Sequence, residues 1–125
     1  MNEYDTLIAA PTISFKGKGN CIRIGKSVVR LLGNPSYISI KVNDALDTVV
    51  VFPCDEDEVM SFKVPQNLFL SHEHSMRIHS KRFVHTLMEM NQMDTERTYS
   101  VVGEYTEAEN SMIFRLAEKV EWNLR

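Results

Sequence analysis

The chain has few cysteines and no long apolar run, and each shortage excludes a class of protein. Its only cysteines, Cys21 and Cys54, are too few and too far apart for a zinc motif, and they read as reduced packing residues rather than a disulfide. No apolar run approaches the ~20 residues that span a bilayer. Residues 1–10 lack a basic region followed by an apolar stretch, so we expect no secretion signal and a cytoplasmic location.

Motifs of catalysis are missing as well. The sequence contains no nucleophile motif, P-loop, paired-carboxylate pattern or Rossmann glycine string. We therefore predict a protein that is not an enzyme and needs no cofactor. With 125 residues and 43% hydrophobic content, the chain fits one globular domain, or two half-domains that share a core.

The charge distribution says more than the net charge of −3, which by itself argues against a nucleic-acid binder. Residues 16–30 hold five basic side chains and no acid, and residues 71–85 hold Arg77, Lys81, Arg82 and all four histidines beside one acid. Acids gather elsewhere, notably at 55–58. This clustering predicts a basic surface, and solvated loops and helix faces are the alternative reading.

Two stretches of the chain carry a similar pattern. Residues 20–24 read Asn-Cys-Ile-Arg-Ile and residues 74–78 read His-Ser-Met-Arg-Ile, so Arg77 is the expected counterpart of Arg23. Tyr37 and Tyr99 each open a predicted hairpin and form a second expected pair of counterparts. The pattern predicts a pseudo-dimeric single chain in which two units share one core, and chance similarity of short strands is the alternative.

The hydrophobic periodicity predicts an α+β fold, mainly β, of two β-hairpin–short helix–β-hairpin repeats. The expected strands are 12–16, 21–24, 37–42, 48–52, 59–64, 75–78, 98–105 and 111–116. A helix is expected at 26–32, ended by Gly33, and another at 81–90 with Ser80 as its N-cap. The expected organisation is a tail (1–11), a first repeat (12–53), an acidic linker (54–66) and a second repeat (67–120).

The run from Lys16 to Ile24, followed by a short helix and a hairpin, resembles the swapped-hairpin barrels of the AbrB/MazE (SpoVT/AbrB) family. Gly19-Asn20 and Ile22-Arg23-Ile24 match the family's recurring string, although Gly25 and His79 stand where the family usually has proline. The resemblance covers most of the first half and, more weakly, a similar span of the second. It implies one pseudo-twofold barrel in a tandem arrangement like that of MraZ, and a DNA-binding transcriptional regulator.

The charge map and the resemblance together indicate a double-stranded DNA interface. Arg23 and Arg77, which should point outward from short strands, are the expected groove contacts, because arginine can read guanine through two hydrogen bonds. Gly17 and Gly19 would let the backbone approach DNA. If about six phosphates are contacted, log affinity should fall against log salt with a slope near −5. The full predicted set is Lys16, Lys18, Asn20, Arg23, Lys26, Arg30, Arg77, Lys81 and Arg82.

Other functions stay open at this point. The acidic run Asp55–Glu58 suits a protein-binding inhibitor, such as an antitoxin or a phage-encoded inhibitor of a nuclease or defence complex, and a purely structural module is the third possibility. A further homodimer is possible. The histidines His72, His74, His79 and His85 fit no zinc signature, and we expect them to add positive charge below about pH 6.5 rather than to bind metal.

Overall fold

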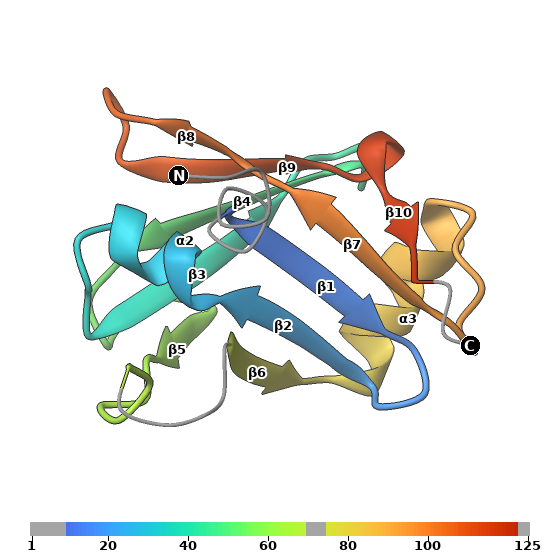
Figure 1. Cartoon of the computed structure of the whole chain (residues 1–125), viewed down its shortest axis with the longest axis horizontal. Helices are drawn as coiled ribbons and strands as arrows, with labels where there is room; N and C mark the ends of the chain where they lie inside the picture. Colours follow the sequence, from blue (N-terminus) through green and yellow to red (C-terminus); the bar gives the residue numbers. More distant parts are fainter. Residues whose placement is uncertain (1–9, 70–74, 123–125) are drawn as a thin grey trace, which may run out of the picture.

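Two antiparallel five-stranded sheets face each other, and a helix lies at each end of the molecule (Figure 1). The computed structural model describes residues 10–69 and 75–122. The strands run in the order β10-β7-β1-β2-β6 in one sheet, named sheet A, and β5-β3-β4-β9-β8 in the other, named sheet B. The predicted class, α+β and mainly β, is confirmed.

The elements follow the predicted periodicity closely. Sheet A contains β1 (Thr12–Lys16), β2 (Cys21–Gly25), β6 (Ser75–His79), β7 (Thr98–Val102) and β10 (Val120–Glu121). Sheet B contains β3 (Tyr37–Val42), β4 (Thr48–Pro53), β5 (Ser61–Lys63), β8 (Glu104–Thr106) and β9 (Ser111–Arg115). The helices are α2 (Lys26–Leu31), α3 (Lys81–Met90) and a short 3₁₀ helix (Leu116–Glu118).

One hydrophobic core lies between the sheets, because the strands alternate inward apolar with outward polar residues. Sheet A contributes Ile13, Phe15, Ile22 and Ile24, all fully buried, and sheet B contributes residues such as Val51 and Phe114. The helices close the core's ends, with Val28 and Val29 buried on α2 and Val84, Leu87 and Met88 buried on α3.

The start of α3 and the end of α2 follow from local chemistry, as predicted. The Ser80 hydroxyl accepts a hydrogen bond from the Phe83 amide at 3.4 Å, so it caps the start of α3. Gly33 has a φ of +90°, a conformation that favours glycine, and it lies just past the end of α2.

The pairing registers relate the two halves of the chain. In the β2–β6 ladder Arg23 lies directly opposite its expected counterpart, Arg77. Val42 pairs with Val49 in the first hairpin and Tyr105 pairs with Met112 in the second, so one constant offset along the sequence maps the first pair onto the second.

The same offset maps Tyr37 onto Ser100, one position from Tyr99, and the match of Tyr37 with Tyr99 stays a prediction. The two tyrosine side chains differ in their surroundings. Tyr99 is 8% exposed and faces the core, whereas the Tyr37 hydroxyl donates a hydrogen bond to the Glu56 carboxylate at the surface. A difference of one position matters in a strand, because it moves a side chain to the opposite face.

Two strand predictions need correction. The strand expected at 98–105 is interrupted at Gly103, where the chain leaves β7 in sheet A and enters β8 in sheet B. A Cβ at Gly103 would lie 2.5 Å from the Phe114 ring, so glycine lets the crossing strand pass close to the core. The second repeat, expected to open with a hairpin from residue 67, begins with a turn at residues 66–69, and β1 pairs with β7.

Candidate nucleic-acid interface

The outward face of sheet A carries basic side chains in adjoining strands. Cross-strand partners point the same way, so the registers define three outward rows. These rows are Ser100–Ser14–Arg23–Arg77, Thr98–Lys16–Cys21–His79 and Val102–Thr12–Gly25–Ser75. None of these positions holds an acid. We name the surface formed by Lys16, Arg23, Arg77 and His79 the basic face.

Arg23 and Arg77 form the centre of the basic face. They lie directly opposite each other in the β2–β6 ladder, and like charges in that arrangement destabilise a sheet. Arg77 is exposed, whereas Arg23 is half-buried and its Nε is a buried donor without a hydrogen-bond partner in the described part of the chain. An unsatisfied buried donor costs about 1–3 kcal/mol. Two arginines from different strands thus lie side by side at the centre of the basic face.

The turn between β1 and β2 extends this basic surface. The amide of Gly17 donates to the Arg97 carbonyl at 3.2 Å, and His85 Nε2 donates to the Gly17 carbonyl at 3.0 Å. The amide of Ser80, the N-cap of α3, donates to the Asn20 carbonyl at 3.0 Å. These contacts hold the turn, and exposed Lys18 within it, beside the first turn of α3.

We expected Gly17 to let the backbone approach DNA, but Gly17 is buried against another part of the chain. A Cβ at this position would lie 1.8 Å from the Thr95 carbonyl oxygen, so the glycine serves close packing of the turn. Gly19 and Lys18 are the exposed positions of the turn.

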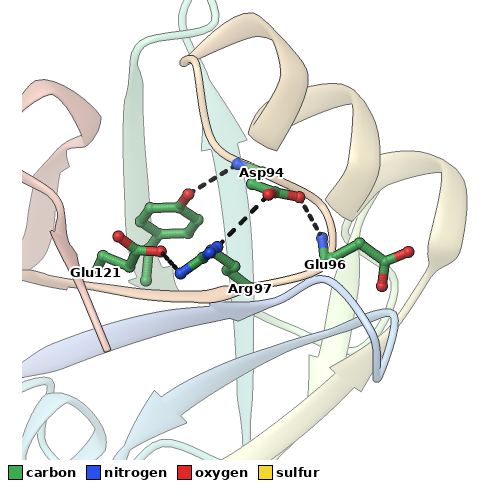
Figure 2. Close-up of polar contacts among 5 residues, drawn as sticks. Asp94, Glu96, Arg97 and Glu121 are labelled. Carbon is green, nitrogen blue, oxygen red and sulfur yellow. Dashed lines mark hydrogen bonds and ion pairs between the residues drawn. The ribbon is translucent and has the colours of Figure 1, made fainter. Parts of the chain in front are cut away.

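The loop that supports this turn is tied down by polar contacts (Figure 2). Arg97 Nη1 lies 2.9 Å from Glu121 on β10, and its Nε lies 3.6 Å from Asp94. The Asp94 carboxylate also accepts from the Glu96 amide at 2.9 Å, and the Asp94 amide donates to the Tyr99 hydroxyl at 2.8 Å. The hydrogen bond and charge of Glu121 raise the pKa of Arg97. The carboxylates of Glu121 and Asp94 are thus engaged with Arg97.

The structure brings together most, but not all, of the predicted DNA-binding residues. Exposed Lys81 and Arg82 open α3 next to the β1–β2 turn, at one end of the β2–β6 ladder. Lys26 and Arg30 lie on α2 at the other end, about 14 Å along β2. The Arg30 guanidinium stacks 5.1 Å from the Phe69 ring centre. Lys16, Arg23 and Arg77 therefore remain together on the basic face, and Lys26 and Arg30 lie apart from them.

Sequence reasoning missed two serines that lie beside the arginines. Ser14 and Ser100 are hydrogen-bonded to each other through their hydroxyls at 2.8 Å, in the same row as Arg23 and Arg77. Ser14 is only 7% exposed although it points away from the core. The alternation of Thr12–Lys16 was enough to place Ser14 outward, but its neighbour Ser100 depends on the β1–β7 pairing.

Within residues 10–69 and 75–122, no three His, Cys, Asp or Glu side chains are placed to hold a metal ion. The expectation for His72 and His74 lies outside the described residues. Cys21 is buried and Cys54 half-buried, and both are free thiols.

Neither described α-helix has both the length and the apolar character needed to cross a membrane. Comparisons of the chain with protein-family models, curated proteins and solved structures gave no significant match.

Proposed function

We propose that the chain is a DNA-binding transcriptional regulator that contacts DNA through the basic face. The observation that carries the proposal is the direct pairing of Arg23 with Arg77 on a sheet surface whose outward positions hold no acid. A surface of this kind attracts anions, and DNA supplies phosphates at regular spacing. Lys16, Lys18, Lys81 and Arg82 extend the same charge toward the β1–β2 turn.

We also propose that the two sheets form an AbrB-like pseudo-twofold barrel. The registers that relate β2 to β6 and one hairpin to the other support this. So do two matching contacts between halves. Asn91, after α3, donates to the Leu46 carbonyl in the first hairpin at 2.7 Å, and Asn110 in the second hairpin donates to the Leu32 carbonyl after α2 at 3.4 Å.

The test is binding to fluorescently labelled random-sequence duplex DNA, followed by anisotropy during a salt titration. The wild-type chain should bind at low salt, and log affinity should fall with a slope near −5 against log salt. Arg77→Glu should weaken binding about tenfold or more and reduce the slope by at least about one. Arg77 is the first choice because it is exposed, whereas substitution of half-buried Arg23 also perturbs the sheet.

The matched control is Lys41→Glu, the same charge change at an exposed position on the outward face of sheet B. It should leave affinity and slope unchanged. Equal losses in both variants would show an effect of net charge alone and would remove the assignment to the basic face.

A second candidate function is inhibition of a protein partner through the acidic segment Asp55–Glu58. All four acids are exposed, and they are followed by Val59, which is 82% exposed. An acidic segment next to exposed apolar surface suits a basic channel of another protein. Absence of DNA binding at any salt would favour this candidate. Its test is a pull-down of the protein partner with the wild-type chain and with a variant in which all four acids are changed to Asn or Gln. The wild-type chain should capture the partner and the variant should not.

A further inference from the structure

The only tryptophan of the chain lies on the same side of sheet A as the basic face. Val120 pairs with Ser100, and the Trp122 amide donates to the Thr98 carbonyl at 2.8 Å, so both apolar side chains share the outward side with Ser100. The Trp122 indole Nε1 donates a hydrogen bond to the Ser100 hydroxyl. This bond holds the indole against the sheet, while 44% of the residue stays exposed.

The outward surface of sheet A changes from apolar at one side to basic at the other. Its β7–β10 side presents Trp122 with Val102 and Val120, which are 56% and 67% exposed. Its β2–β6 side presents Arg23 and Arg77, and the two hydrogen-bonded serines lie between. Three strand spacings separate β7 from β6, about 14 Å in all. Aromatic and cationic groups therefore occur together on one continuous strand surface.

We infer that this surface binds single-stranded nucleic acid, with an unpaired base stacked on Trp122 and the backbone phosphates on Arg23, Arg77 and Lys16. The inference rests on the basic face of the proposed function and adds single strands to the duplex DNA that this face is proposed to bind. A single strand exposes the faces of its bases, whereas a duplex buries them in its stack. A tryptophan beside a basic surface therefore suits a single strand. The hydrogen bond from the indole Nε1 to Ser100 fixes the ring before binding, which lowers the conformational entropy lost on binding.

The inference is tested on the full chain with a short oligo(dT) strand, an oligo(U) strand and a duplex of the same length. Because Trp122 is the sole tryptophan, intrinsic fluorescence reports directly on its ring. Oligo(dT) or oligo(U) should quench the fluorescence saturably. Trp122→Ala should weaken single-strand binding about 5- to 150-fold and leave duplex binding unchanged. Trp122→Phe, which keeps an aromatic face, should recover most of the affinity.

The remaining outcomes separate this inference from the proposed function. If Trp122→Ala leaves single-strand affinity unchanged while duplex DNA still binds, the stacking role is overturned and the basic face stands. If Trp122→Ala weakens single-strand and duplex binding equally, Trp122 acts only by supporting the sheet, and the inference is again overturned. Failure of all three nucleic acids to bind at low salt overturns the proposed function as well.

Discussion

At the scale of single residues, outward position was the property that could be predicted best. Arg23 lies between buried Ile22 and Ile24, and Arg77 lies between buried Met76 and Ile78, so alternation alone placed both on the surface. Their position opposite each other could not be predicted from local pattern, since it depends on a strand pairing between different halves of the chain. The same holds for Gly17, whose packing partner Thr95 is distant in sequence.

Gly17 should be intolerant of any side chain. Gly17→Ala places a methyl group where the Thr95 carbonyl lies, so the β1–β2 turn must move and lose its bonds to Arg97 and His85. We expect the free energy of unfolding to fall by roughly 1–3 kcal/mol, measured by chemical denaturation of the full chain. Gly19→Ala is the control, since its Cβ would lie 3.7 Å from the nearest atom, the Cys21 Sγ. Equal stability of the two variants would contradict the close packing at Gly17.

At the scale of elements, the hairpin loops are built from their own polar side chains. Asn43 Oδ1 accepts from the amides of Asp47 and Thr48 at 3.0 Å each, and Asn43 Nδ2 donates to the Asp47 carboxylate at 2.6 Å. This network closes the β3–β4 loop, and Asn91 after α3 then docks on the Leu46 carbonyl within it. The loop could be predicted from its polar composition, but its contact with a distant helix end could not.

The β3–β4 loop should make stability depend on acid pH. Hydrogen bonds from Asn43 and then Thr48 lower the pKa of Asp47 below its ordinary 3.8. A carboxylate with a lowered pKa stabilises the folded state at pH values above its pKa in the unfolded chain. This stabilisation is lost as the pH falls through the pKa of the folded state. Asp47→Asn should therefore lower Tm at neutral pH, and its difference from wild type should shrink below about pH 4. A difference that stays constant from neutral to acid pH would contradict this account.

Asp44→Asn is the matched control for that measurement. Asp44 is exposed in the same loop and makes no hydrogen bond within the described residues. Its substitution should leave the pH profile of Tm parallel to that of the wild-type chain.

At the scale of the whole molecule, the sequence predicted the class, most strands, both helices and the outward arginines. It did not predict the crossing at Gly103 or the pairing of β1 with β7, because neither leaves a local periodic signal. The candidate site was predictable to a similar degree. Its basic residues could be identified in the sequence. Which of them lie on the basic face, and that Lys26 and Arg30 lie at the far end of the sheet, could be determined only from the order of the strands.

Separated halves should not fold independently. The ladders β1–β7, β2–β6 and β4–β9 all join the first half to the second, and they enclose one core. Residues 1–66 alone should be unfolded or self-associated, as measured by circular dichroism and light scattering. Mixing them with residues 67–125 should restore strand content. A stable, monomeric 1–66 fragment would show that the core is not shared.

The opposition of Arg23 and Arg77 has a consequence for how the halves stay together. In two separate chains, the pairing of β2 with β6 would require association, and dilution would pull the partners apart. Here both strands belong to one chain, so their joining is unimolecular and independent of concentration. The polypeptide link therefore keeps Arg23 opposite Arg77 at any protein concentration.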